Sequence, residues 1–239
     1  MSSRALAPLG RIDEATKRLV ETVSGLADEQ VAGSTLIPPR TRGHVITHVA
    51  RAADSLCRLL EGARTAVEIP QYASMHARDA EIEAGAERPV ADLVSDVVSN
   101  SARLDTAARS LPEAAWGRRV RLRAGELRTP AGLMGTRLRE LEVHHADLAA
   151  GYAFADIPDS VARWIVDDIH QTLSLRADTP GMRLEATDAG LAWDVGDGGP
   201  VVGGALADLL VRLSGRSPGG AGLSSSAEGG AMPEAPHWI

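Results

Sequence analysis

The segment RELEVHHADL, residues 139–148, places a carboxylate and an imidazole one helical turn apart. Leucines and a valine in and beside the segment predict a partly buried helix. In such a helix, Glu140 and His144 leave the same face, one above the other. Burying polar groups without partners is costly, so we interpret this pair as ligands of a metal ion. The alternative is a solvated pair in which the carboxylate simply satisfies the histidine.

A second histidine pair occurs far upstream, in the segment RGHVITHVA at residues 42–50. His44 and His48 are also four residues apart, and apolar residues surround them. One imidazole from this segment would complete a set of two histidines and one carboxylate. Catalytic zinc sites have that composition, with a fourth position left open for water or substrate. The two segments therefore predict a three-ligand metal site between an early helix and a later one.

Spacing alone leaves the choice of ligands open. Either His44 or Asp147 could serve as a ligand, because each lies about one turn from another candidate. We favour Asp147 as the acceptor of a ligand imidazole N–H, or else as a surface or interhelical partner, and His44 as a capping or polar residue near the start of its helix. His145 leaves the helix about 100° from His144 and is expected to lie outside the site.

The composition limits the class of protein. The chain has 239 residues, of which 44% are hydrophobic and only 3% aromatic, so its core must be mainly aliphatic. A net charge of –7 without a basic block argues against nucleic-acid binding. We find no secretory signal and no apolar run that could span a bilayer, so we expect a cytoplasmic protein. Frequent Ala, Gly and Arg with few Lys are typical of a GC-rich bacterial genome.

The one cysteine, Cys57, excludes an intrachain disulfide and a zinc site built from several cysteines. It occurs among leucines in a helical pattern, so we interpret it as a core residue and not as a nucleophile.

The first two thirds of the chain are expected to be helical. Apolar residues recur at helical spacing over residues 8–30, 41–65 and 89–110. Ser74 is placed to cap a short third helix. Pro130 is placed to begin the helix of the metal pair, and Gly151 to end it. Residues 120–128 predict a short hairpin or an extended insert, and Pro38-Pro39 requires a loop.

The pattern changes after Gly151. Helices are expected over residues 160–175 and 204–214, and strands over residues 182–188, 191–195 and 201–203. The tail, residues 217–236, is rich in Gly, Ser and Pro and predicts a loop. We therefore expect an α+β fold, with an antiparallel four-helix bundle in residues 1–153 and a small α/β domain in residues 154–239.

These segments, in this order, resemble the mycothiol-dependent maleylpyruvate isomerases of the DinB-like superfamily of metal-binding four-helix bundles. The resemblance covers nearly the whole chain. It is carried by HVITHVA at 44–50, PQY at 70–72, ARDAEI at 77–82, AW at 115–116, RE at 139–140 with His144, DL at 147–148, DIP at 156–158, LSGR at 213–216 and WI at 238–239.

The resemblance implies a reaction and a ligand set. The zinc ligands of the family fall on His48, Glu140 and His144, and its functionally important C-terminal arginine falls on Arg216. The expected reaction, part of aromatic degradation in actinobacteria, converts maleylpyruvate to fumarylpyruvate with Zn2+ and mycothiol as cofactors. Thiol addition to the double bond, rotation and elimination would accomplish this cis–trans isomerisation.

The substrate has two carboxylates, so an acidic protein must supply local positive charge. Arg216 is the first candidate because a guanidinium binds a carboxylate through two parallel hydrogen bonds. From the second domain it could reach the metal across a cleft between domains. Alternatively, it interacts only with the end of its own helix. Arg78 and Tyr72 are candidates for binding the thiol cofactor, although Arg78 could equally pair with Glu81.

Two other functions remain open from the sequence. One is a zinc-dependent mycothiol S-transferase of the same superfamily, acting on another electrophile. The other is a non-catalytic protein that binds metal or thiol. In each case we expect small-molecule partners, no nucleic acid, no membrane, and a monomer or weak homo-oligomer.

Overall fold

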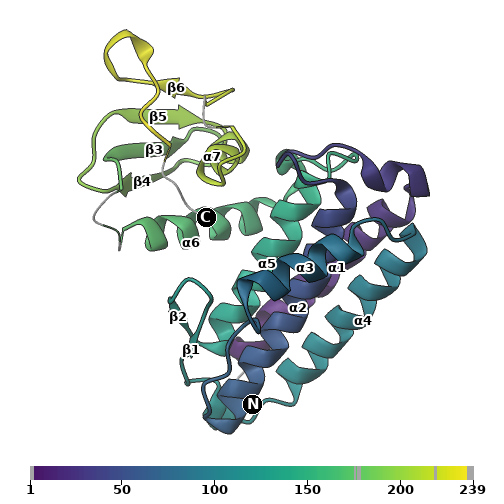
Figure 1. Ribbon diagram of the computed structural model, residues 1–239. Helices are drawn as coiled ribbons and strands as arrows, with labels where there is room; N and C mark the ends of the chain where they lie inside the picture. Colours follow the sequence, from purple (N-terminus) through teal and green to yellow (C-terminus); the bar gives the residue numbers. More distant parts are fainter. Residues whose placement is uncertain (1–2, 175, 177–178, 218–219, 236–239) are drawn as a thin grey trace. The chain divides into compact units, whose positions relative to one another are not determined.

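The computed structural model describes residues 3–174, 176, 179–217 and 220–235. It divides the chain into two compact units, Met1–Tyr152 and Ala153–Ile239 (Figure 1). Trp238 and Ile239, which contribute to the resemblance noted above, lie outside the described residues. The fold is mixed α+β, with long helices in the first unit and a small sheet in the second.

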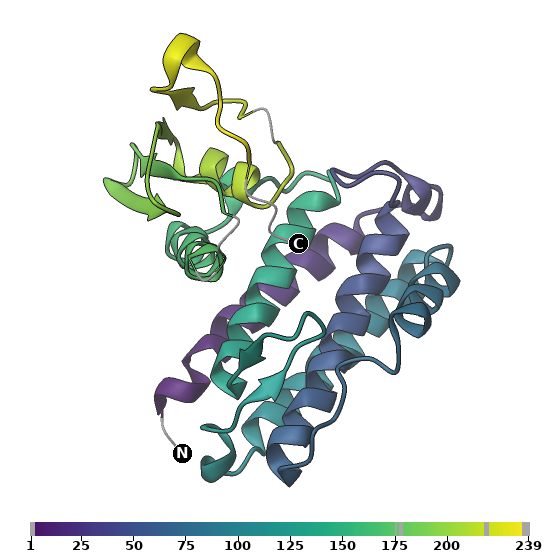
Figure 2. The same ribbon diagram turned by 60° about the vertical axis from the view of Figure 1, so that its left-hand side comes forward.

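Four long helices form the first unit (Figures 1 and 2). They are α1 (Ser3–Ser24), α2 (Arg42–Thr65), α4 (Val90–Arg109) and α5 (Pro130–Asp147). Helix α2 packs against α4 and α5, and α1 packs against the same two helices. The shorter helix α3 (Met75–Gly85) packs on α2. Each long helix therefore has two long neighbours, and α2 and α5 are in direct contact.

Short elements connect these helices. They are the 3-10 turns η1 (Asp28–Ala32) and η2 (Glu113–Ala115) and the strands β1 (Val120–Arg121) and β2 (Leu127–Arg128). The two strands pair antiparallel, which confirms the expected hairpin.

Capping side chains determine where two of the helices begin. Ser74 Oγ accepts a hydrogen bond from the Ala77 backbone N–H at 3.0 Å, which confirms its expected role at the start of α3. Thr129 Oγ1 does the same for Gly132 at 3.4 Å, directly before Pro130. Proline is favourable there because its missing N–H would have no partner inside the helix.

Two helix ends differ from the expectation. The first helix ends at Ser24, and residues 28–32 form the separate turn η1, where Gln30 Oε1 accepts from the Ala27 N–H at 2.9 Å. Helix α5 ends at Asp147 and not at Gly151. Ala149 has a φ of 48°, so the backbone turns left-handed two residues before that glycine.

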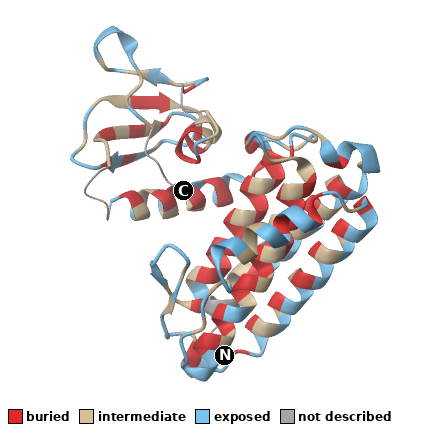
Figure 3. Cartoon of the chain, in the orientation of Figure 1, coloured by how far each residue is buried: buried red, intermediate tan, exposed pale blue. Residues whose placement is uncertain are grey.

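The core of the first unit is aliphatic, and α2 and α5 contribute many of its buried residues (Figure 3). Ile46 and Val49 of α2 and Leu133 and Leu141 of α5 are fully buried. Helix α5 also buries several polar side chains, among them Arg137, Glu142 and Asp147. A buried polar group requires a partner, so these residues indicate where α5 contacts its neighbours.

In its described residues, the second unit contains a four-stranded sheet and two α-helices. The elements are η3 (Phe154–Asp156), α6 (Asp159–Leu173), β3 (Met182–Ala186), β4 (Leu191–Val195), β5 (Val201–Gly204), α7 (Leu206–Leu213), β6 (Ser224–Ser225) and η4 (Glu228–Gly230). The strand order is β4-β3-β5-β6, with β3 and β5 parallel and the other pairs antiparallel. Strand β6 lies in the tail that was expected to be a loop. No described helix is long and apolar enough to cross a membrane.

Close approach of α2 to the end of α3 requires glycine at residue 43. A Cβ there would overlap the Ala86 carbonyl oxygen and lie 2.7 Å from Val31 Cγ1. We therefore expect Gly43→Ala to lower the free energy of unfolding by about 2 kcal/mol or more, measured by urea denaturation.

Gly10→Ala is the matched control, because a Cβ at this exposed position of α1 has no atom within 4 Å. It should stabilise the protein by about 0.5–1 kcal/mol, the usual gain from replacing a helical glycine. Equal stability of the two variants would show that α2 and α3 do not need this close contact.

Candidate metal centre

Three side chains from α2 and α5 bring their donor atoms together. Helix α2 supplies His48, and α5 supplies Glu140 and His144. Glu140 Oε2 lies 3.0 Å from His48 Nε2 and 3.3 Å from His144 Nε2, and the two Nε2 atoms are 3.1 Å apart. Among the residues that the structure describes, this is the only group of metal-ligating side chains that converges in this way.

The donor set fits a zinc ion. Two imidazole nitrogens and one carboxylate oxygen, all within 4.8 Å of one another, match the ligands of catalytic zinc sites. A ligating nitrogen presents a lone pair, so two of them 3.1 Å apart need a proton or a cation between them. The three side chains are between 15% and 17% exposed, so the group is shielded but reachable from solvent.

Asp147 orients His144 from behind. The carboxylate is fully buried, and its Oδ2 accepts from His144 Nδ1 at 2.8 Å, the contact expected from the sequence. With Nδ1 engaged, Nε2 points toward His48 and Glu140. Burial lowers the pKa of His144, but the hydrogen bonds that His144 donates to Asp147 and Glu140 outweigh it and raise that pKa to about 9.

The pKa values of Glu140 and His48 are also shifted by burial and by their hydrogen bonds. Burial raises the pKa of Glu140, yet the hydrogen bonds from His144 and His48 outweigh it and hold that pKa well below its ordinary value. Burial is the main cause that lowers the pKa of His48. Glu140 is therefore ionised, as a metal-ligating carboxylate must be.

Arg78 contacts His48, and Tyr72 lies beside Arg78. Arg78 Nη2 donates to His48 Nδ1 at 3.2 Å, and its Nη1 donates to Asp79 at 2.7 Å, so its partner is Asp79 and not Glu81. The Tyr72 ring centre is 5.7 Å from Arg78 Cζ. Because a guanidinium can only donate, the neutral His48 ring carries its proton on Nε2. A metal ion bound at Nε2 would displace that proton, and a ring that stayed neutral would then carry its proton on Nδ1 and lose the Arg78 contact.

His44 occupies a different place from His48. Its Nδ1 lies 2.7 Å from Thr41 Oγ1 at the start of α2, and its Nε2 lies 3.0 Å from Glu83 of α3. Both ring nitrogens are thus engaged near the start of the helix, one turn away from the converging donors.

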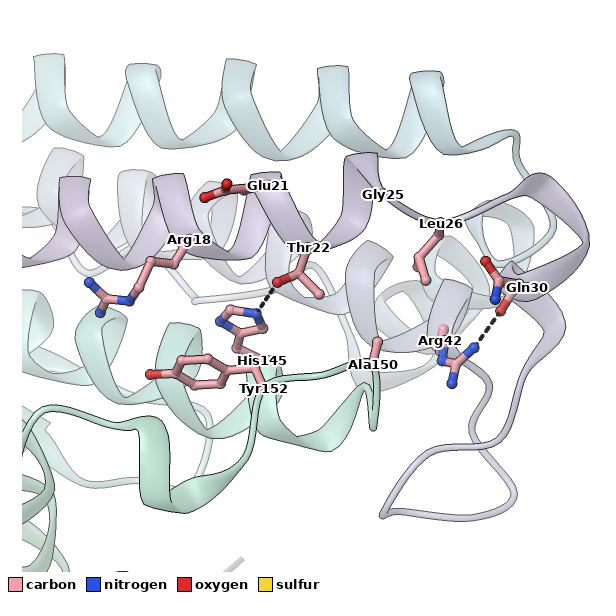
Figure 4. Close-up of a pocket in the computed structure, with 10 residues that line it drawn as sticks. All are labelled: Arg18, Glu21, Thr22, Gly25, Leu26, Gln30, Arg42, His145, Ala150 and Tyr152. Atoms are coloured by element: carbon pink, nitrogen blue, oxygen red, sulfur yellow. Dashed lines mark hydrogen bonds between the residues drawn. The ribbon is translucent and has the colours of Figure 1, made fainter.

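His145 faces away from the metal centre. Its Nε2 lies 2.7 Å from Thr22 Oγ1 of α1, and its ring stacks on Tyr152 with the ring centres 3.8 Å apart (Figure 4). Tyr152 in turn donates to Glu142 at 2.6 Å, and Arg18 donates to the same carboxylate at 2.6 Å.

A pocket of about 520 Å3 lies beside His145 and Tyr152 (Figure 4). His48, Glu140 and His144 do not line it. It is lined by Arg18, Glu21, Thr22, Gly25, Leu26, Gln30, Arg42, His145, Ala150 and Tyr152. Several of these side chains hydrogen-bond to one another or to neighbouring residues, which is typical of a structural contact between α1 and the end of α5.

Two further candidates lie elsewhere. Cys57 is half-buried in α2, and burial raises the pKa of its thiol, which makes it a poor nucleophile near neutral pH. Arg216 follows α7 in the second unit, is partly buried, and donates through Nη1 to the Ser214 carbonyl oxygen.

Sequence reasoning missed Arg137, which is completely buried three residues before Glu140. The sequence could have indicated it, because Arg137 is a charged residue on the helical face that carries Glu140 and His144.

Comparison with known proteins identifies the family. The family described as the mycothiol maleylpyruvate isomerase N-terminal domain matches residues 12–149. A crystal structure of the mycothiol-dependent maleylpyruvate isomerase is 30% identical and covers 100% of both chains, with a TM-score of 0.88. A second structure, a histidine-to-alanine mutant of that isomerase, is 29% identical with the same coverage and TM-score. No curated protein matches the sequence. Since the family match spans more than half of the chain, the chain belongs to the mycothiol-dependent maleylpyruvate isomerase family.

Proposed function

We propose that the chain is a zinc- and mycothiol-dependent isomerase that converts maleylpyruvate to fumarylpyruvate. The observation that carries this proposal is the convergence of His48, Glu140 and His144, in a chain whose family is named for the reaction.

We also propose that α1, α2, α4 and α5 form an antiparallel four-helix bundle of the DinB-like class, with domains at residues 1–153 and 154–239. The pairwise packing of these helices supports the bundle.

In this proposal, His48 and His144 hold zinc through Nε2, and Glu140 holds it through a carboxylate oxygen. When bound, zinc with an open fourth position would lower the pKa of a coordinated thiol or polarise a substrate carbonyl. The role of Asp147 is to keep the His144 ring in the orientation that presents Nε2.

The nucleophilic thiol is proposed to come from mycothiol, because Cys57 is half-buried with a raised pKa. When bound, this thiol would supply a nucleophile that adds to the carbon–carbon double bond as the π electrons move to the conjugated carbonyl, and after rotation their return would expel the thiol and leave the trans double bond. Arg78 and Tyr72 are proposed to contact the thiol cofactor, since Arg78 hydrogen-bonds to His48 and Tyr72 lies beside Arg78. Arg216 is proposed to bind a substrate carboxylate through its planar guanidinium.

The metal assignment is tested with two histidines one helical turn apart. We expect His48→Ala to lose stoichiometric zinc, measured by metal analysis, and to lose mycothiol-dependent turnover of maleylpyruvate. His44→Ala should keep both and lose only about 1 kcal/mol of stability, because it removes a helix-capping contact.

Full zinc occupancy in His48→Ala would remove that residue from the site. Turnover of other electrophiles with mycothiol, without isomerisation of maleylpyruvate by the wild-type protein, would instead favour an S-transferase.

The origin of the thiol is tested with Cys57→Ser. A buried hydroxyl can lower stability, but kcat with mycothiol should stay within about two-fold of wild type, because the reacting sulfur is external. Loss of turnover in a Cys57→Ser protein that remains folded and zinc-bound would show that the chain supplies the nucleophile itself.

Arg216 is tested by its effect on substrate use. A charged hydrogen bond in a binding site contributes about 1.5–3 kcal/mol, so Arg216→Ala should lower kcat/KM roughly ten- to a hundred-fold without loss of zinc. Arg216→Lys should recover only part of the activity, because an ammonium group lacks the planar fork. If Arg216→Ala has near-normal kcat/KM, the residue serves only the end of α7.

A further inference from the structure

Arg137 is a buried cation next to the proposed metal centre. Its side chain is completely inaccessible to solvent and is among the largest buried side chains of the described residues. It precedes Glu140 by three residues and His144 by seven, so all three side chains leave the same face of α5. That face is directed at α2, which carries His48.

The guanidinium connects three helices. Its Nη1 donates to the Val49 carbonyl oxygen of α2 at 2.7 Å, and its Nη2 donates to Ser101 Oγ of α4 at 3.0 Å. Val49 directly follows His48 in the chain. One arginine of α5 thus holds the backbone of α2 beside the residue whose imidazole must meet Glu140 and His144.

Burying the charged Arg137 side chain costs folding free energy. Arg137 forms no ion pair with a described residue, both of its acceptors are neutral, and its buried Nε has no hydrogen-bond partner. Burial lowers its pKa to about 10, with the charge of Glu140 partly opposing that effect, so it remains a cation at neutral pH. An apolar side chain of similar size is often at least as stable as a buried charge. Global stability therefore does not explain the arginine.

We propose that Arg137 is a positioning residue for the metal centre, which uses its forked hydrogen bonds to hold α2 at the separation from α5 that the three ligands require. This role rests on the proposed metal site. Leucine or methionine could fill the same space, but neither can bond to Val49 and Ser101 at once.

The test compares Arg137→Met with wild type in two measurements. The first is zinc affinity, determined by competition with a chromophoric chelator. The second is the visible absorption spectrum after substitution with Co2+, which reports ligand geometry. Arg137→Met should bind zinc about ten- to a hundred-fold more weakly, as expected when support behind metal ligands is lost. Its Co2+ bands should shift or broaden.

The matched control is Arg42→Met. Arg42 also joins α2 to the end of α5, donating from Nε to the Leu148 carbonyl at 2.8 Å and from Nη2 to the Ala149 carbonyl at 2.9 Å. These contacts lie beyond the metal-binding turn. Arg42→Met should lower the urea midpoint of the metal-free protein. Its zinc affinity should stay within about two-fold of wild type, and its Co2+ spectrum should not shift.

Ser101→Ala is a second variant in case Arg137→Met does not fold. It removes one acceptor of the guanidinium with little change in volume, and it should weaken zinc binding by a smaller factor, about two- to five-fold. Arg137→Lys, which keeps the charge but not the fork, should recover only part of the affinity.

Unchanged zinc affinity and an unchanged Co2+ spectrum in folded Arg137→Met, or in Ser101→Ala if the former does not fold, would overturn the positioning role while leaving the metal site intact. Failure of the wild-type protein to bind zinc would overturn the metal site itself, and the role of Arg137 with it.

Discussion

The packing of α2 against α5 is the constraint on which the rest of the structure depends. The three candidate ligands are divided between these helices, so their distances are set by the way the helices meet. Sliding one helix along the other by a single residue would move its ligands by about 1.5 Å. Metal–ligand distances tolerate only about 0.2 Å. Buried aliphatic residues such as Ile46 and Leu141 resist that movement because the interior is close-packed.

Apolar packing alone does not select one arrangement among several of similar volume, and the polar groups of α5 add that selectivity. Arg137 bonds to α2 and α4, Glu142 bonds to Arg18 of α1, and the Asp147 backbone carbonyl accepts from the Leu36 N–H at 3.0 Å. Each of these groups is buried and would be costly in any arrangement that removed its partner. Helix α5 is therefore held from several directions at once.

Local features were predictable from the sequence, and long-range pairings were not. The pair Glu140 and His144 follows from helical spacing, and the cap at Ser74 from its residue type. Spacing could not separate His44 from His48, because both lie on one face of α2. Only the first turn of that helix, where His44 contacts Thr41, distinguishes them. The acceptors of Arg137 lie far away in the chain, and no local pattern identifies them. The end of α5 was also missed, because it depends on a left-handed alanine where glycine is the usual residue.

His144 and His145 are adjacent in the chain, and their side chains leave α5 about 100° apart, toward different neighbours. One ring meets the donors of α2 and α5, while the other is bonded to Thr22 and stacked on Tyr152 (Figure 4). The helix therefore cannot rotate about its own axis in either direction without straining one of these two contacts. The two neighbouring imidazoles contact different helices, and together they restrict the rotation of α5 about its axis.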